Sequence, residues 1–295
     1  MNIEVRFGAQ GVGHDYAQCT EGTTGDESWV ETPYNEKLAS FGKGYDICWA
    51  NLPDKALGDI QLSAEYLAHG IKYLAQRSPA SSHRIHVLGH SQGGVNVFEC
   101  LQGSRDTQAL RFPFQGIEVS ALRCPATKVF RTCVPAVLQL MADSKFMAAL
   151  NSNKDSESGA RALVPTTSIF SDYDLIIRLE GKNLNVSSWL SGATMIKIQN
   201  STVCGKEHFT EHFEIMVDQA VFGLVSDAIL HERPANISNF NEKLCHGQVK
   251  NLALNLHQVP KVLKAMFYSY FGDHKLEWFW NPYSHLALAY EPKLQ

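Results

Sequence analysis

A serine lies between glycines where an apolar run gives way to a helical pattern. The pentapeptide Gly-His-Ser-Gln-Gly occupies positions 89–93, after a strand-like run at 84–88 and at the start of a helical pattern at 93–102. A chain that turns from strand to helix within a few residues needs glycines, because they have no Cβ to collide with neighbouring backbone. The serine hydroxyl then lies at a helix N-terminus, whose dipole favours developing negative charge. The pattern predicts that Ser91 is a nucleophile.

A serine hydroxyl needs a base and an acid close by before it can attack a carbonyl. The base takes the hydroxyl proton, and the acid fixes the tautomer of the base. In a strand–turn–helix arrangement of this kind, the acid and then the histidine follow the serine in the chain. Asp172 and Asp174 follow one strand-like run, and His208 and His212 follow another. The residues alone leave both choices open, and five further histidines lie downstream: His231, His246, His257, His274 and His285.

The same turn supplies a donor for an oxyanion. The intermediate of acyl transfer carries negative charge on the former carbonyl oxygen, and fixed N–H groups stabilise that charge. In this type of turn, one donor is the backbone N–H of the residue after the nucleophile. We therefore expect the backbone N–H of Gln92 to form part of an oxyanion hole.

Strand-like and helical patterns alternate along the chain. Apolar residues recur at helical spacing in several segments, and β-rich runs lie between them. Such alternation predicts an α/β fold in which a mostly parallel sheet is flanked by helices. The expected helices are 54–76, 93–102, 135–150 and 213–230, and the expected strands are 84–88, 116–122, 166–170 and 193–199.

Length and composition suit one large domain with a sizeable core. The chain has 295 residues, of which 44% are hydrophobic, so we expect a single domain over residues 1–295. The formal net charge of −4 and the lack of a Lys/Arg cluster argue against a nucleic-acid partner. No run of about eighteen apolar residues is present, so no transmembrane segment is expected.

The residues do not settle the compartment. The first residues lack the basic and apolar regions of a signal peptide. Against that, the chain has seven cysteines and three glycosylation sequons, at Asn185, Asn200 and Asn236. An odd number of cysteines leaves at least one thiol unpaired within a monomer.

Several short motifs occur together in one order. They are Gly-Thr-Thr-Gly at 22–25, Gly-Tyr-Asp-Ile-Cys-Trp at 44–49, Ser-Gln-Gly-Gly at 91–94, Val-Pro-Thr-Thr at 164–167, Ser-Asp-Tyr-Asp at 171–174 and Val-Cys-Gly at 203–205. From residue 22 to about 245, with a weaker match to about 290, the chain resembles the fungal lipases of the Candida antarctica lipase B type, within the α/β-hydrolase family. Each motif alone is weak, but their order and spacing together are specific.

The resemblance implies a fold, a reaction and a set of site residues. It implies an α/β-hydrolase fold with a small or absent lid, and hydrolysis or synthesis of small-molecule or lipid esters without a cofactor or metal ion. The nucleophile corresponds to Ser91, the acid to Asp174 and the base to His212. The resemblance further implies a disulfide between Cys204 and Cys245, secretion from the cell, and contact with a lipid interface.

The chain departs from the family pattern at both ends and in the turn. Residues 1–20 are atypical, since 10–19 is glycine-rich and polar and only 3–7 resembles a strand; a shortened N-terminus would account for this. The threonine that donates to the oxyanion in the family falls on Glu21, or on Thr20 after a shift of one residue, and Thr23 is near. His90 stands where the family has a tryptophan, and we expect it to alter local packing only. Residues 250–295 diverge.

Two other functions fit the same residues. An acyltransferase or cyclase would use an identical triad with an alcohol or an internal nucleophile in place of water. A hydrolase-like protein with an impaired oxyanion loop would instead bind a hydrophobic ligand. Fluorophosphonate labelling distinguishes the ligand-binding protein from an enzyme. Analysis of products distinguishes the acyltransferase or cyclase from a hydrolase.

Overall fold

The structure is a computed structural model of the full chain. It describes residues 17–21, 32–38, 45–50, 52–102, 108–109, 135–152, 161–174, 177, 188–212, 214–246 and 292–293. The expected strand at 116–122, the strand-like 3–7 and most of the divergent segment 250–295 lie outside these residues.

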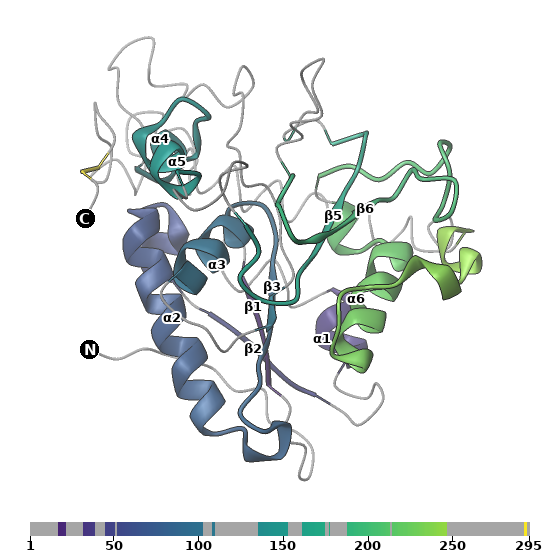
Figure 1. The fold of residues 1–295 in the computed structure, drawn as a ribbon, viewed down its shortest axis with the longest axis horizontal. Coiled ribbons are helices and arrows are strands. Elements are labelled where there is room, and N and C mark those ends of the chain that lie inside the picture. Colours follow the sequence, from purple (N-terminus) through teal and green to yellow (C-terminus); the bar gives the residue numbers. More distant parts are fainter. Residues whose placement is uncertain are drawn as a thin grey trace, which may run out of the picture.

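Parallel strands form the centre of the molecule, as the alternating pattern predicts (Figure 1). Four of them form a sheet in the order β2-β1-β3-β4, and two more form a second parallel pair. The strands of the sheet are β1 (Ala17–Glu21), β2 (Asp46–Trp49), β3 (His86–Gly89) and β4 (Gln108–Ala109), and the pair is β5 (Thr167–Phe170) and β6 (Thr194–Lys197).

Helices cover the strands. The α-helices are α1 (Pro33–Lys37), α2 (Ile60–Gln76), α3 (Gln92–Gln102), α4 (Pro135–Leu140), α5 (Lys145–Leu150) and α6 (Gln219–His231). The 3-10 helices are η3 (Pro53–Ala56), η4 (Pro79–Ser81), η6 (Glu214–Met216), η7 (Ile237–Asn239) and η8 (Glu242–His246). Within the described residues, no helix combines the length and the hydrophobicity that a membrane span requires.

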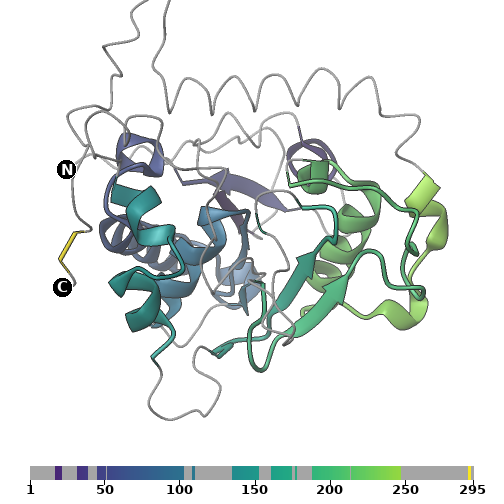
Figure 2. The same cartoon turned by 90° about the horizontal axis from the view of Figure 1, so that it is seen from above.

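Strand β3 separates two apolar layers, because successive side chains of a strand point to opposite faces. Val87 packs in a buried cluster with residues of α2 and α3, such as Leu67 and Val97. Leu88 packs in the other cluster with residues of α6, such as Leu224. Figures 1 and 2 show α2 and α3 on one side of β3 and α6 on the other. Helices on both faces of a parallel sheet define an α/β fold.

One prediction about the N-terminus is wrong. The polar composition of 10–19 argued against a strand there, yet β1 spans Ala17–Glu21 and lies in the sheet between β2 and β3. It pairs with both neighbours, so that Thr20 is level with Leu88 and Glu21 with Gly89. A strand that is hydrogen-bonded on both sides forms even where its own propensity is weak, since tertiary context overrides propensity.

Buried caps divide helices that the pattern predicts as continuous. The segment 135–150 forms α4 and α5 because the Ser144 hydroxyl accepts from Met147 N (2.9 Å) and donates to the Gln139 carbonyl (2.7 Å). The segment 213–230 likewise forms η6 and α6. There the Asp218 carboxylate accepts from the backbone N–H of Ala220 at 2.7 Å and caps α6.

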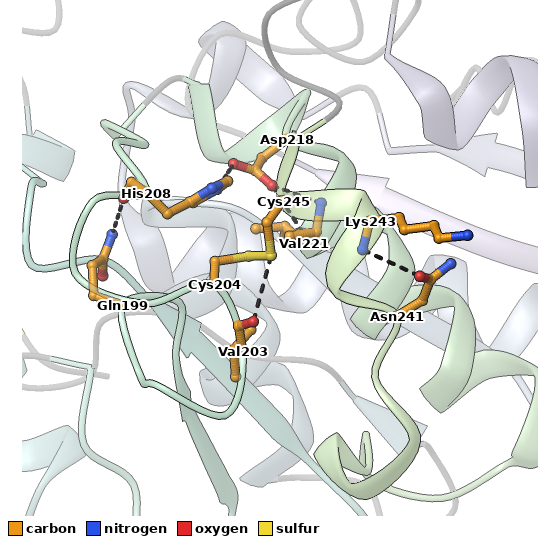
Figure 3. Close-up of a disulfide and its surroundings, with 10 residues drawn as sticks. Gln199, Val203, Cys204, His208, Asp218, Val221, Asn241, Lys243 and Cys245 are labelled. Atoms are coloured by element: carbon orange, nitrogen blue, oxygen red, sulfur yellow. Dashed lines mark hydrogen bonds and ion pairs between the residues drawn. A yellow bond between two sulfur atoms is a disulfide. The ribbon is translucent and has the colours of Figure 1, made fainter.

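A disulfide joins Cys204 to Cys245, as the resemblance implies, with the two Cα atoms 5.4 Å apart (Figure 3). It ties the turn after β6 to η8, which packs on α6. The bond closes a loop with a sequence separation of 41 residues. Closing such a loop restricts the unfolded chain and stabilises the fold by about 2–4 kcal/mol.

We therefore predict that the double variant Cys204→Ser/Cys245→Ser loses about 2–4 kcal/mol of unfolding free energy in urea. The exposed Ser201 in the same turn provides a matched control, because Ser201→Ala leaves the disulfide and the sequon in place and should change stability by less than about 0.5 kcal/mol. Peptide mapping without reduction should show the two cysteines linked in the parent, and equal stability of parent and double variant would contradict the prediction.

Candidate active site

Ser91 lies in a strained turn between β3 and α3. Its φ is +57°, a left-handed conformation that is uncommon for a residue with a side chain. The chain passes so closely that a Cβ on Gly89 would lie 2.7 Å from the backbone of Gly93 and Gly94. A side chain at position 89 would therefore displace the turn. This confirms the structural reason for a glycine in the pentapeptide.

The structure brings Ser91, His212 and Asp174 together. His212 Nε2 lies 3.0 Å from Ser91 Oγ, and His212 Nδ1 lies 2.8 Å from Asp174 Oδ2. Because a carboxylate can only accept, Nδ1 carries the proton and Nε2 can accept from the serine hydroxyl. The His212 side chain is 3% exposed and the Asp174 side chain 11%, so both bonds are shielded from water.

Each member of this trio follows the carboxyl end of a different strand. Ser91 follows β3, Asp174 follows β5 and His212 lies beyond β6. The backbone N–H of Ile177 donates to Asp174 Oδ1 at 2.7 Å, which leaves Oδ2 directed at the imidazole. Loops at the carboxyl ends of parallel strands are where α/β proteins place functional groups.

The alternative acid lies away from the serine. The Asp172 carboxylate forms a half-exposed ion pair with Lys197 (3.1 Å), and its backbone N–H donates to Gln199 Oε1 (2.9 Å). The structure therefore gives Asp172 a surface ion pair and places Asp174 beside the imidazole.

The alternative base, His208, has a structural partner of its own. Its Nε2 lies 2.8 Å from Asp218 Oδ2, and both side chains are almost fully buried (Figure 3). The carboxylate that caps α6 therefore satisfies the imidazole of His208 inside the protein. Of the other histidines, His231 bonds Asp227 on α6 and His246 ends η8, while His257, His274 and His285 lie outside the described residues.

The expected oxyanion donor Gln92 opens α3. Among the described residues no acceptor contacts its backbone N–H, whereas its side-chain amide donates to the Ala56 carbonyl at 2.6 Å and fixes the residue in place. Thr20 and Glu21 end β1, beside the strand that leads into the serine turn. The backbone thus brings both alternatives to the same end of the sheet as Gln92, and Thr23 lies outside the described residues.

His90 does more than alter packing, which sequence reasoning missed. Its Nε2–H donates to the backbone carbonyl of His212 at 2.8 Å, and the two rings pack with centroids 4.8 Å apart. Burial, and next the neighbouring His212, lower the pKa of His90 from 6.5 to about 3. His90 therefore stays neutral and adds no positive charge beside the base.

One cluster has the residue types of a metal site. Cys204, His208 and Cys245 offer ligand atoms within 4.8 Å of one another in the described part of the chain. The two sulfur atoms are bonded to each other, however, and the imidazole Nε2–H donates to the Asp218 carboxylate. The disulfide thus uses both thiolates that a metal ion would need.

The lowered pKa of His90 predicts acid sensitivity. The unfolded state binds a proton at His90 below about pH 6.5, while the folded state resists it until about pH 3, so this contribution is complete above pH 6.5 and is lost as the pH falls toward 3. Between pH 6.5 and about pH 4.5 the parent should lose about 2–3 kcal/mol more than His90→Gln, measured by urea unfolding.

The exposed His69 on α2 supplies the control, because His69→Gln should follow the parent across the same range. Burial also lowers the pKa of His86, but that residue is present in all three proteins and cancels from the difference. Parallel stability curves for the parent and His90→Gln would refute this assignment.

The chain is similar in sequence to a fungal lipase. No family model matches the chain. The chain is 28% identical to lipase B of Pseudozyma antarctica over 209 residues, which are 67% of this chain and 56% of that protein. It therefore spans little more than half the length of this curated relative.

Solved structures show the same fold. Aspergillus fumigatus lipase B matches with a TM-score of 0.74 and 22% identity, over 95% of this chain and 66% of that one. The mature form of Bacillus licheniformis lipase BlEst2 matches with a TM-score of 0.50 and 15% identity, over 72% of this chain and 92% of that one. The chain has the α/β-hydrolase fold, and its sequence is similar to that of a fungal lipase B.

Proposed function

We propose that this protein is a serine hydrolase that cleaves carboxylic esters through an acyl-enzyme on Ser91. The observation that carries the proposal is the pair of bonds through His212, 3.0 Å to the hydroxyl and 2.8 Å to Asp174. A nucleophile, a base and an orienting acid within hydrogen-bond reach are what acyl transfer requires.

The reaction proceeds in two halves. His212 Nε2 takes the hydroxyl proton as Ser91 Oγ attacks the ester carbonyl, and then gives it to the leaving alcohol. Water deprotonated by the same nitrogen then attacks the acyl carbon. The bond to Ser91 Oγ breaks, Oγ takes the proton back from His212, and the carboxylic acid leaves. Asp174 keeps the Nδ1–H tautomer and stabilises the imidazolium that forms in each half. The Gln92 N–H donates to the oxyanion.

The similarity to a lipase B supports an ester with an apolar acyl group as substrate, together with action at a lipid surface and secretion. These remain parts of the proposal, because the chain spans only part of that relative. The turn gives the hydrolase assignment physical support, since strain at Ser91 is the kind of feature that functional sites retain.

The triad predicts a sharp pattern of losses. Ser91→Ala, Asp174→Asn and His212→Ala should each lower kcat on a p-nitrophenyl ester by about four orders of magnitude or more, because the three groups act as a unit. Ser91→Ala should also abolish labelling by a fluorophosphonate. Circular dichroism and urea unfolding should show that the variants fold.

Asp172→Asn is the matched control for Asp174→Asn. It makes the same change two residues away, at an ion pair that faces solvent, and should stay within about tenfold of the parent. His208→Ala cannot serve in the same way, since it removes a buried partner of Asp218 and should lower stability. An inert Asp172→Asn beside an active Asp174→Asn would reverse the choice of acid.

The position of Glu21 at the end of β1 predicts that replacing its carboxylate raises the activity. A carboxylate at the oxyanion position would oppose the charge that an oxyanion hole stabilises, and one good donor is worth about 3 kcal/mol, or roughly a hundredfold in rate. We predict that Glu21→Thr raises kcat at neutral pH, by up to about a hundredfold.

Thr20→Val tests the competing assignment, in which Thr20 is already the donor. An unchanged rate for Glu21→Thr together with a large loss for Thr20→Val would show that the oxyanion hole is complete in the parent. Analysis of products in the presence of an added alcohol would then reveal whether water or the alcohol resolves the acyl-enzyme.

A further inference from the structure

The segment that carries His212 has no regular secondary structure. Its side chains alternate between buried and more exposed positions, as in an extended chain. Residues 208–211 belong to no helix or strand. His208, Thr210 and His212 are buried, whereas Phe209 between them is 53% exposed. A base on such a segment has no ladder or helix of its own to hold it at the serine.

Three buried side chains donate to every second carbonyl of this segment. Gln199 Nε2–H donates to the His208 carbonyl at 2.9 Å, a bond drawn in Figure 3. Ser171 Oγ–H donates to the Thr210 carbonyl at 2.6 Å. The third donor is His90, whose Nε2–H reaches the His212 carbonyl at 2.8 Å. Bonds to every second carbonyl have the spacing that a neighbouring strand would also provide.

The three donors follow three different strands. Two of those strands, β3 and β5, also lead to Ser91 and Asp174. His90 follows β3 directly before Ser91, and Ser171 follows β5 three residues before Asp174. Gln199 follows β6, the strand before the histidine segment. The bond from His90 therefore fixes the His212 segment relative to Ser91, and the bond from Ser171 fixes it relative to Asp174.

Gln199 and Ser171 also bond each other. Gln199 Nε2 donates to Ser171 Oγ at 2.9 Å, and Gln199 Oε1 accepts from Asp172 N at 2.9 Å. The Ser171 hydroxyl oxygen accepts a further bond from Tyr173 N at 3.1 Å. Every polar atom of the Gln199 amide is thus used, and a buried network with all its members satisfied is rigid and specifies one arrangement.

We propose that His90, Ser171 and Gln199 are positioning residues that hold the segment 208–212 so that His212 Nε2 stays at Ser91 Oγ. The inference rests on the proposed function, in which His212 is the base. Misplacement of a reacting group by about 1 Å can cost about a hundredfold in rate, so the carbonyl bonds act on catalysis without touching substrate. His90 serves this role as a neutral donor and therefore does not repel the imidazolium.

The matched pair His90→Phe and His90→Gln tests the bond directly. Phenylalanine keeps a ring against His212 but has no donor, whereas the glutamine amide can still reach the carbonyl. We expect His90→Phe to lower kcat on a p-nitrophenyl ester by about ten- to a hundredfold with KM within about twofold, and His90→Gln to recover most of the loss. Ser171→Ala and Gln199→Met should resemble His90→Phe.

A second readout separates positioning from general damage. In a His212→Ala background the three variants should cause no further loss of the residual rate, because no imidazole is left to position. Glu207→Ala, an exposed change just before the segment, should leave kcat unchanged. If Ser171→Ala or Gln199→Met fails to fold, the His90 pair still decides the question.

Proton NMR of the His212 Nδ1–H reports the same geometry without turnover. The downfield resonance should persist in His90→Gln and be lost or shifted in His90→Phe. If the signal is lost in His90→Phe but no fluorophosphonate labels the parent, the positioning role stands and the proposed hydrolase does not. Equal kcat, KM and resonance in His90→Phe and the parent, with the parent labelled at Ser91, would overturn the positioning role alone.

Discussion

The site depends on one contact, the 3.0 Å approach of His212 Nε2 to Ser91 Oγ across 121 residues of chain. A proton passes between two groups only when they lie within hydrogen-bond distance, so the elements on either side must hold that approach. The strained turn at Ser91 fixes one partner through close backbone contact at Gly89. The other partner lies on an irregular segment, which explains why so many buried polar side chains converge there.

Polar groups inside this protein are used to connect elements. Asp218 both caps α6 and bonds His208, so helix and loop share one buried carboxylate. The disulfide from Cys204 to Cys245 lies beside that pair and ties the same turn to η8 (Figure 3). Leaving one member of such a pair unsatisfied costs more than the bond itself contributes. The loop is consequently held from the α6 side by a disulfide and a buried hydrogen bond.

From the strand side, the loop is held by hydrogen bonds to backbone. A β-ladder would hold a neighbouring segment through main-chain donors spaced along a strand. Here Gln199 and Ser171 supply side-chain donors instead, which lets the segment turn toward Ser91 where a strand would continue straight. The segment thus lacks regular secondary structure and brings His212 to Ser91. The position of His212 thus depends on side chains that lie outside the trio.

The sequence by itself determined the features whose causes are local. The serine turn needs only the glycines and the flanking patterns within a few residues. The apolar spacing also predicts α2, although the helix begins at Ile60 after the Asp59 cap and residues 53–56 form a separate 3-10 helix. Residue types alone left Asp172 against Asp174 and His208 against His212 open, and the motif resemblance indicated Asp174 and His212. Tertiary structure decided the rest. The polar β1 became a strand because two neighbouring strands pair with it. Asp218 caps α6, which separates α6 from η6 within the predicted helix. His90 acquired its partner only through folding, because the carbonyl it bonds lies 122 residues away and no local pattern records such a contact.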